Sequence, residues 1–429
     1  MFAAASPNPE NSPSAGGSFL PALTGLRFFA ALHVVGHHLR SSRLLDLQAW
    51  PEVDRFFQRA GASVGLFFIL SGFILTYGNL NRQRSKPFRT AAFLRDRFAR
   101  IYPVYFLGLL LTLPMFLIER SYLGDGAVSR ETLLFGGLVL TLTQAWLPNA
   151  ALAWNVPGWS LSVEFFFYLL FPAALAGLQR GSRRALVGGI VCCGGVAIGL
   201  AFYVAMNAIA VRTATGLSPD QLTAVMKYDP LVRLPEFLFG MLLGRLFFLR
   251  NEAISHHPAA RRADLPARGR SYGAAAAAAA FIGILAYCPN GILDLPIHNG
   301  LLAPLIGVLL WQLALGGRGL AAFLARPAIV ALGQASFALY IVHTPIIQFS
   351  RIVMSIRGGA AATSPAVAAL ATVLAIIAAL VVRKYYEEPL RKWIHGVGSK
   401  RARGGDAATG STEPARATVA ASPAVVGAR

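Results

Sequence analysis

Long apolar runs separated by short basic segments set the pattern of this chain. An apolar run of roughly 17 residues or more can cross the hydrocarbon core of a bilayer as an α-helix. The pattern therefore predicts an all-α fold, a polytopic helical bundle in a membrane. The eleven segments that reach this length are residues 20–39, 62–80, 100–118, 132–148, 158–178, 185–206, 231–249, 272–288, 298–315, 332–350 and 365–386.

Composition supports this prediction. Of the 429 residues, 55% are hydrophobic and only 14% are charged, whereas soluble proteins carry about 25% charged residues. The formal charge of +20 raises the question of a nucleic-acid partner. However, the basic residues fall mostly between apolar runs, as in the cytoplasmic loops of membrane proteins. We therefore expect contacts with membrane lipids and no nucleic-acid partner.

The two ends of the chain differ from the rest. Residues 1–18 and 395–429 are rich in small and polar residues, and we expect disordered cytoplasmic tails there. Residues 1–18 lack the basic start of a cleavable signal peptide, so the first apolar helix is expected to target the chain. Residues 19–394 are expected to form one membrane domain.

Loop charges predict the orientation of the helices. The segments 82–100 and 180–184 are basic, so both are expected in the cytoplasm. Three apolar candidates lie between them, and an odd number of crossings cannot return the chain to its starting side. We therefore expect about ten transmembrane helices, both termini in the cytoplasm, and one re-entrant or peripheral segment. Uncharged sequence interrupted by proline and asparagine between Trp146 and Trp159 is the preferred candidate, with a cavity beside it.

The first predicted helix carries ionisable groups inside the bilayer. Arg27 and His38 are eleven residues apart, which brings them within about 20° of each other around the helix and about 16 Å apart along it. Such groups cost at least ~2.5 kcal/mol each and suggest a function. His33 points about 140° away from His38, so we expect no compact metal site. His38 is equally compatible with catalysis and with a place at the headgroup level.

Three arginines lead from a basic loop into a predicted span. Arg95, Arg97 and Arg100 are suited to phosphate groups, because a planar guanidinium can bind two phosphate oxygens at once. A nucleotide-bearing cytoplasmic ligand would fit them. Positive-inside topology or contact with anionic lipids explains the same residues equally well.

Glu164 is one of two acidic residues deep in predicted spans. Ser160, Glu164 and Tyr168 share one face of a helix. Because a buried carboxylate must be neutral or paired, we expect a partner such as Arg27 or His38.

Glu236 is the other deep acidic residue, and Arg233 lies one turn earlier. An internal ion pair and a substrate contact are equally open for these two residues. Gly240 and Gly244 have the small-xxx-small spacing of closely packed helices, and we interpret them as a packing edge.

A polar stripe marks one face of a later helix. Ser336, Tyr340 and His343 lie on this face, at spacings of four and three residues. The stripe can line a pocket or form hydrogen bonds between helices, and for Ser336 the second interpretation is preferred.

Six pieces of sequence, in order across residues 20–394, carry a resemblance to a known family. They are Leu23-Thr-Gly-Leu-Arg27 with His38, Gly65-Leu-Phe-Phe-Ile-Leu-Ser-Gly-Phe-Ile-Leu75, Arg97-Phe-Ala-Arg-Ile-Tyr-Pro103, Trp159-Ser-Leu-Ser-Val-Glu164, Ser336-Phe-Ala-Leu-Tyr-Ile-Val-His343 and Glu388-Pro389. With them the chain resembles the acyltransferase-3 family, membrane O-acyltransferases that include bacterial O-antigen, exopolysaccharide and nodulation-factor acetylases. The family spacing of an arginine, ten residues and a histidine selects His38 over His37 and His33.

The resemblance implies ten membrane helices and acyl transfer from acyl-CoA, usually acetyl-CoA, to a hydroxyl group. It implies His38 as the general base, oriented by Glu164 where that carboxylate reaches the imidazole. Arg27 would stabilise the thioester oxyanion or hold the pantetheine arm. Acyl-CoA would be a substrate, and no permanently bound cofactor is expected. The CoA phosphates are expected on Arg95, Arg97 and Arg100, and other substrate contacts on Trp159, Ser160, Tyr168, Arg233, Glu236, Tyr340 and His343.

We therefore expect an O-acetyltransferase of the bacterial cytoplasmic (inner) membrane that acylates a cell-surface or exported saccharide or glycolipid. Lipopolysaccharide including O-antigen, capsular or exopolysaccharide, a small glycoside and a membrane lipid all stay open as acceptors. Recognition of the acceptor is expected in loops such as 41–60 and 207–230. A glycolipid transporter or flippase and a non-catalytic membrane sensor are the competing interpretations.

Overall fold

The computed structural model of the chain describes residues 19–122, 129–256, 267–358 and 363–394. The tails expected at 1–18 and 395–429 lie outside these residues. The described residues form helices and turns without any strand. The predicted all-α fold is therefore confirmed.

The helices vary widely in length, from short turns to α4 with 33 residues. In chain order they are α1 (Pro21–Ser41), α2 (Pro51–Gln58), α3 (Gly61–Gln83), α4 (Thr90–Tyr122), α5 (Arg130–Leu140), η2 (Gln144–Trp146), α6 (Gly158–Arg180), α7 (Arg183–Met206), α8 (Ala208–Thr215), α9 (Pro219–Tyr228), α10 (Pro230–His256), α12 (Ala267–Tyr287), α13 (Asp294–His298), α14 (Ala303–Ala314), α15 (Leu320–Leu324), α16 (Pro327–Gln334), α17 (Ser336–Gly358), α18 (Pro365–Val382) and the π-helical turn η3 (Arg383–Glu387).

Several of these elements meet the requirements for crossing a membrane. Within the described residues, seven segments are long and apolar enough: α3, α4, α6, α7, α13 with α14, α17, and α18 with the residues after it. The helices α1, α10 and α12 have 21, 27 and 21 residues but include more charged or polar side chains. These seven segments confirm the predicted polytopic bundle, and the three additional helices are compatible with the expected total of about ten spans.

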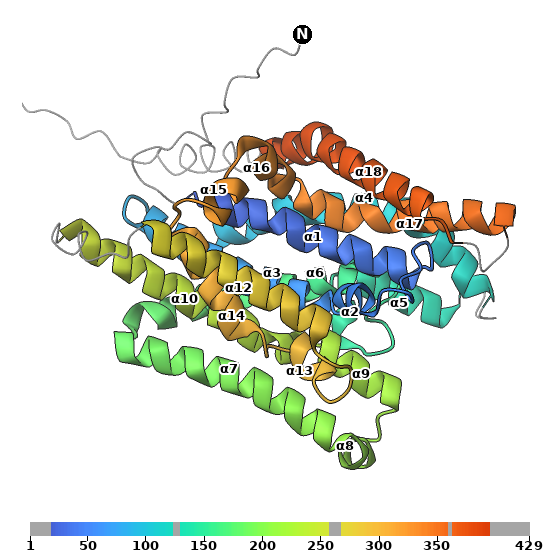
Figure 1. Cartoon of the computed structure of the whole chain (residues 1–429), viewed down its shortest axis with the longest axis horizontal. Coiled ribbons are helices and arrows are strands. Elements are labelled where there is room, and N and C mark those ends of the chain that lie inside the picture. The colour runs from blue at the N-terminus through green and yellow to red at the C-terminus, as the bar shows by residue number, and fades with distance from the viewer. Residues whose placement is uncertain (1–18, 123–128, 257–266, 359–362, 395–429) are drawn as a thin grey trace, which may run out of the picture.

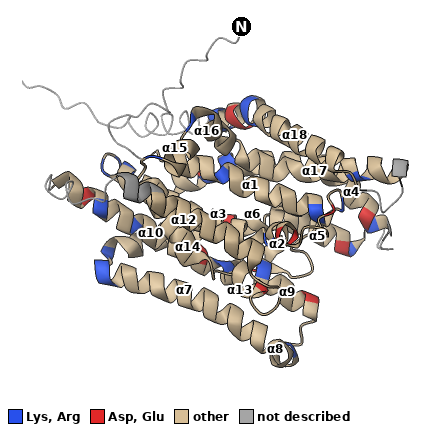
Figure 2. Cartoon of the chain, in the orientation of Figure 1, with Lys and Arg blue, Asp and Glu red and all other residues tan. Residues whose placement is uncertain are grey.

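The long helices lie side by side along one axis of the molecule (Figure 1). The connections α3–α4 and α6–α7 lie at one end, which we call the basic end because it holds the basic segments 82–100 and 180–184. Toward the other end, called the opposite end below, lie α2, α8 and α9. Between the two ends, Figure 2 shows mostly uncharged ribbon. The bundle therefore has the charge pattern of a membrane-spanning unit.

After α4 the chain does not run back to the basic end as one continuous helix. The candidate span 132–148 contains only α5, whose eleven residues extend about 16 Å, too short for a hydrocarbon core of about 30 Å. After η2 the chain continues in turns up to the start of α6. Tyr105 donates a hydrogen bond to the carbonyl of Val139 (2.8 Å), and Trp154 donates one to that of Leu109 (2.9 Å). The first bond holds α5 against α4, and the second holds the irregular segment predicted near Trp146–Trp159 against it. Together, α5 and α6 make the return.

Glycines bring α3 and α10 into close contact. A Cβ atom on Gly240 would overlap the carbonyl of Ile69, and one on Gly244 would lie 2.6 Å from the carbonyl oxygen of Phe73. A Cβ on Gly72, across the contact, would overlap the carbonyl of Phe237. The interpretation of Gly240 and Gly244 as a packing edge is confirmed.

Candidate active site

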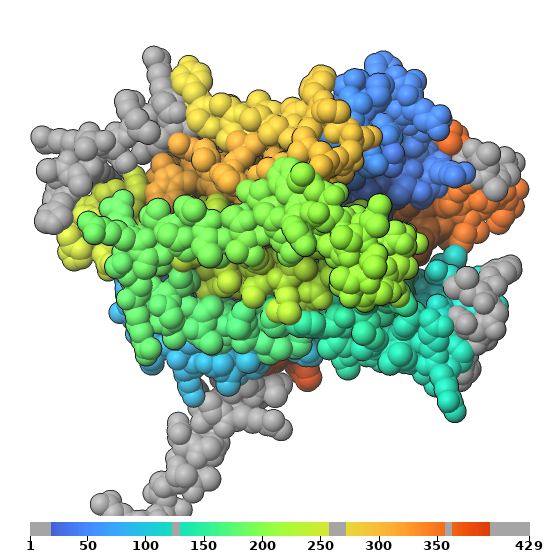
Figure 3. All heavy atoms as spheres, turned by 90° about the horizontal axis from the view of Figure 1, so that it is seen from below, coloured from blue at the N-terminus to red at the C-terminus, as the bar shows by residue number. Residues whose placement is uncertain are grey.

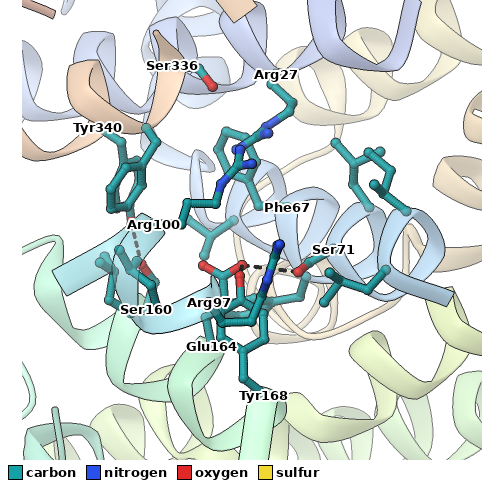
Figure 4. A pocket seen from close by; sticks show the side chains of 18 residues that line it. Arg27, Phe67, Ser71, Arg97, Arg100, Ser160, Glu164, Tyr168, Ser336 and Tyr340 are labelled. Atoms are coloured by element: carbon teal, nitrogen blue, oxygen red, sulfur yellow. Dashed lines mark hydrogen bonds between the residues drawn. The ribbon is translucent and has the colours of Figure 1, made fainter. Parts of the chain in front are cut away.

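A pocket opens between α1, α3, α4, α6 and α17, in the half of the bundle nearer the basic end. It holds about 890 Å³ of empty space, its mouth included. Figure 4 shows the polar side chains that surround it. Those that line it are Arg27, Ser71, Arg97, Arg100, Ser160, Glu164, Tyr168, Ser336 and Tyr340, and apolar residues such as Phe67 and Phe68 fill the remaining wall.

The pocket has an excess of positive charge. Arg27, Arg97 and Arg100 line it, and Glu164 is the one carboxylate among its lining residues. In the described part of the chain, none of these three guanidinium groups forms an ion pair or a hydrogen bond, and the Nε atom of Arg97 is buried without a partner. Uncompensated guanidinium groups in a recess with apolar walls favour an anionic ligand.

Glu164 is held by hydroxyl groups. Its Oε1 atom accepts hydrogen bonds from Ser71 Oγ (3.0 Å) and from the Tyr168 hydroxyl (2.5 Å). Arg27 lies within electrostatic range of the same carboxylate. Of the two partners expected from the sequence, the structure therefore brings Arg27 near Glu164, and the hydrogen bonds of Glu164 do not go to His38.

One side of the pocket ends at a pair of hydroxyl groups. Ser160 Oγ donates to the carbonyl of Pro157 (3.0 Å), so the Tyr340 hydroxyl donates to Ser160 Oγ across 2.8 Å. The Ser336 hydroxyl is buried without a partner within the described residues. The predicted polar stripe on α17 therefore lines the pocket through Ser336 and Tyr340.

His38 lies behind this wall rather than in it. Its ring centre is 5.0 Å from that of His343, which is in turn 6.1 Å from the ring of Tyr340. His343 is fully buried, and its Nδ1 lies 3.1 Å from the carbonyl oxygen of Leu339. That contact assigns the proton to Nδ1, so Nε2, which has no partner among the described residues, is left as an acceptor.

The two other histidines of α1 are occupied by structural hydrogen bonds. His33 bonds through Nδ1 to Ser63 Oγ (2.8 Å) and through Nε2 to the carbonyl of Phe56 (2.7 Å). His37 bonds through Nδ1 to the carbonyl of Phe57 (2.9 Å). Both therefore fasten α1 to α2, and His33 also fastens it to α3.

A salt bridge fixes the end of α1 that carries these histidines. Arg40 donates two hydrogen bonds to the carboxylate of Asp54 in α2, of 2.5 and 2.7 Å. The guanidinium holds the pKa of Asp54 below its usual value of 3.8. The position of His38 is therefore supported from the neighbouring element.

Two of the remaining predicted site residues, Arg95 and Trp159, do not line the pocket. Arg95 is largely exposed and lies 3.7 Å from Asp96. Trp159 is buried between Phe68 and Tyr228. Neither therefore faces the cavity in this structure.

Arg233 and Glu236 form an internal ion pair, one of the two alternatives left open by the sequence. Their charged atoms lie 2.9 Å apart, and both side chains are almost completely buried. Arg233 also donates to the carbonyl of His298 (2.6 Å) and to Asn299 Oδ1 (3.0 Å). The pair therefore anchors α10 to the segment after α13, outside the pocket lining.

Sequence reasoning missed two residues of the site. Ser71 bonds Glu164, and the signal was available, since Ser71 lies inside one of the six family pieces. Glu387 is buried in the π-helical turn η3, within electrostatic range of Arg100 and Arg27. Such turns are frequent at functional sites, but nothing in a single sequence marks this one.

Most of the chain matches a known protein family and individual known proteins. Residues 20–384 match the family model described as acyltransferase domain. The chain is 29% identical to acyltransferase MdmB of Streptomyces mycarofaciens over 375 residues, 85% of this chain and 88% of the relative. It is 28% identical to exopolysaccharide production protein ExoZ of Rhizobium meliloti (strain 1021) over 350 residues, 78% of this chain and 92% of the relative. No solved structure matches the chain significantly.

Proposed function

Because the chain belongs to the acyltransferase-3 family, we propose that it transfers an acyl group, in the first instance acetyl, from cytoplasmic acyl-CoA to a hydroxyl group of a cell-surface or exported saccharide. A relative that is named for exopolysaccharide production supports a saccharide acceptor. The proposed location is the bacterial cytoplasmic membrane, with the basic end and both termini in the cytoplasm, since basic loops stay on that side.

The observation that carries this proposal is the set of three unpaired guanidinium groups in the pocket. CoA is a polyanion, and its phosphate groups match the planar donors of Arg27, Arg97 and Arg100. Two of these arginines lie in the first turns of α4, close to the basic end, where a cytoplasmic donor enters. Arg95, exposed beside them, adds positive charge outside the lining.

The acyl end of the donor then points toward Ser160 and Tyr340. The ring of Tyr340 lies 6.1 Å from that of His343, and the hydroxyl groups of Ser160 and Tyr340 stabilise the oxyanion that forms on the thioester carbonyl. Donor binding breaks the hydrogen bond between the two hydroxyls, which opens the route past Tyr340 to His38. His343 packs against the His38 ring and holds it in place.

The chemical step is a direct acyl transfer. Nucleophilic attack needs a base because a saccharide hydroxyl is almost fully protonated near neutrality, and His38 accepts that proton. The acceptor oxygen forms a bond to the acyl carbon, and the carbon–sulfur bond breaks. The imidazolium of His38 returns its proton to the departing thiolate, which leaves as CoA. Glu164 acts on the donor side, where it balances part of the arginine charge.

A transfer assay with purified protein tests the proposed function. The protein in detergent is incubated with acetyl-CoA labelled in the acetyl group and with bacterial saccharides, and label in the saccharide is measured. Arg100→Ala is expected to weaken acetyl-CoA binding at least tenfold, equivalent to about 1.4 kcal/mol. Arg84→Ala removes an arginine that lies outside the pocket, 50% exposed, near the same end, and is the matched control with unchanged binding.

The alternatives give different outcomes in the same assay. A transporter would move a glycolipid across a vesicle membrane without transferring label. A sensor would show no dependence on acetyl-CoA. Absence of both label transfer and acetyl-CoA binding by the folded protein contradicts the proposal.

A further inference from the structure

A second recess lies toward the opposite end of the bundle. It is separate from the pocket that Arg27, Arg97 and Arg100 line, which we call the donor pocket. The second recess is formed by the end of α7 with α8, α9 and α13, together with Gln58, the last residue of α2, and Arg59, which follows it. Its empty space is about 1470 Å³, its open mouth included. In Figure 3 the green helices α7 to α9 cover the face that is turned to the viewer. We call this recess the outer cleft.

The outer cleft carries two cations that lack a close counter-charge. Arg212 and Lys227 line it and are half-buried, and neither forms an ion pair within the described residues. The Nε atom of Arg212 is buried without a hydrogen-bond partner there. Burial lowers the pKa of Lys227, and the charge of Asp294 only partly offsets this effect. Both groups therefore gain from an anion that enters the cleft.

The one carboxylate among the lining residues is already used. Asp294 accepts hydrogen bonds of 2.8 and 3.2 Å from Arg59. The rest of the Arg59 guanidinium donates to carbonyl groups at the end of α12. The shortest of these bonds goes to the carbonyl of Cys288, at 2.7 Å. Arg59 and Asp294 thus form a structural ion pair. Arg212 and Lys227 are left as the charged groups available to a ligand.

The outer cleft lies next to the histidines of α1. His298 lines it, and its Nε2 atom is buried without a partner in the described structure. The charge of Lys227 acts on both His298 and His37, and the ring of His37 lies 5.2 Å from that of His38. The cleft therefore lies within electrostatic range of His37, whose ring neighbours that of the proposed general base.

The segments that form the cleft are also those expected to recognise the acceptor. Residues 58 and 59 belong to the expected loop 41–60, and all of α8 and α9 belongs to 207–230. Although far apart in sequence, both segments contribute to the same recess.

We propose that the outer cleft is the acceptor site and that it recognises an acidic saccharide, whose carboxylate or phosphate is bound by Arg212 and Lys227. This inference rests on the proposed function, since it supplies the substrate class for that reaction. The anionic group orients the saccharide so that a hydroxyl faces His38, while acyl-CoA occupies the pocket on the other side of Tyr340. His298 Nε2 accepts a hydrogen bond from another hydroxyl of the same sugar.

Direct binding is the first test, because it does not depend on acyl transfer. The probes are a tetrasaccharide that contains glucuronic acid, its carboxyl-reduced form and glucose 6-phosphate, measured by calorimetry with the full-length protein in a neutral detergent. We expect the acidic tetrasaccharide to bind at least tenfold more tightly than its reduced form. Comparison with glucose 6-phosphate decides between carboxylate and phosphate.

Variants assign that binding to the cleft. Lys227→Met and Arg212→Met are each expected to weaken binding of the acidic probe at least fivefold, with acetyl-CoA binding and thermal stability unchanged. The reduced tetrasaccharide should bind all the variants alike. Arg130→Met removes an exposed arginine at the start of α5, outside the cleft, and should change nothing. Lys227→Glu should abolish the preference for the acidic probe.

Three outcomes would overturn the inference. Equal binding of the acidic and reduced probes shows that charge is not recognised. No binding of any anionic probe at millimolar concentration excludes an anion site. Displacement of bound glucose 6-phosphate by phosphatidylglycerol micelles, but not by the acidic tetrasaccharide, shows that the site binds a lipid headgroup. Conversely, charge-dependent saccharide binding without label transfer supports the cleft while contradicting the proposed reaction, so the two failures are distinguishable.

Discussion

Three histidines near the end of α1 meet three different surroundings. His33 and His37 bond backbone carbonyls of α2, and His33 also bonds Ser63 in α3. The ring of His38 packs against His343 and forms no hydrogen bond within the described residues. A base must keep a ring nitrogen free for the substrate: His33 uses both of its ring nitrogens, His37 uses Nδ1, and His38 uses neither in the part of the chain that the structure describes.

Replacing each histidine in turn tests this assignment. His38→Ala is expected to lower kcat by roughly 10² to 10⁴, the usual contribution of a general base, with acetyl-CoA binding unchanged. His33→Ala breaks two structural hydrogen bonds and is expected to lower thermal stability instead. Label transfer and the unfolding temperature are measured on the same preparations. A folded His38→Ala protein with full activity would exclude the base.

Glu164 shows a limit of prediction from sequence for a single residue. The sequence predicted its burial and offered two partners, yet the bonds it makes go to Ser71 on α3 and to Tyr168 on its own helix, α6. Which side chain on another helix lies opposite a buried group depends on the rotation of both helices, which no single sequence records. The arginine cluster was predicted more fully, because Arg97 and Arg100 lie on one element.

A charge-neutral replacement separates the two roles considered for Glu164. Glu164→Gln keeps an oxygen that accepts hydrogen bonds from Ser71 and Tyr168 but removes the negative charge beside three guanidinium groups. We expect acetyl-CoA to bind about three- to tenfold more tightly, with the pH profile of kcat unchanged. Calorimetry and a pH series of initial rates provide the measurements. A displaced pH profile would instead show that Glu164 tunes His38.

At the scale of elements, the glycine contact between α3 and α10 supports one wall of the pocket. Ser71 of α3 holds Glu164, and the adjacent Gly72 lies against α10. In a membrane, helices associate through such close packing rather than through the hydrophobic effect. The spacing of Gly240 and Gly244 was enough to predict a contact, but not which helix makes it.

A single methyl group should disrupt this contact. Gly240→Ala places a Cβ against the carbonyl of Ile69 and is expected to cost about 1 to 3 kcal/mol, as overpacking usually does. Gly188→Ala adds the same group where nothing lies within 4 Å, and should be neutral or slightly stabilising because alanine favours helix. Unfolding temperatures in detergent provide the comparison. Equal effects of the two variants would contradict the packing role.

The interrupted path from α4 through α5 to α6 was predicted in part from the sequence. The excess of one apolar segment between two basic loops predicted a non-spanning piece, and proline and asparagine predicted where the backbone is irregular. The sequence did not show that α5 and α6 would share the return, because the apolar run 132–148 looks continuous. Its helix ends at Leu140, where bonds from Tyr102 and Tyr105 capture the last carbonyls.

At the scale of the whole molecule, the donor pocket and the outer cleft lie toward different ends of the bundle. The proposed orientation gives them access to different compartments, with His38 between them. CoA does not cross a bilayer unaided because it is highly charged. The reaction should therefore depend on the side from which the donor is supplied.

Sealed vesicles test this dependence. Acetyl-CoA added outside should support transfer in inside-out vesicles, whose basic end faces the medium, and at least tenfold less in right-side-out vesicles. Permeabilisation with detergent should restore equal rates, which controls for the amount of protein. The opposite preference would invert the proposed orientation.

The outer cleft is built mainly from short helices and connections, α8, α9 and the residues after α2, whereas the donor pocket is built from the long helices. Substitutions in the first group need not disturb the packing of the second. If the proposed donor pocket and acceptor site are correct, a lineage could therefore change its acceptor by exchanging a few dozen residues while keeping the donor pocket. Such a division of labour would allow cell-coat chemistry to diversify rapidly, and grafting residues 207–228 from one relative onto another would be a practical way to redirect the enzyme.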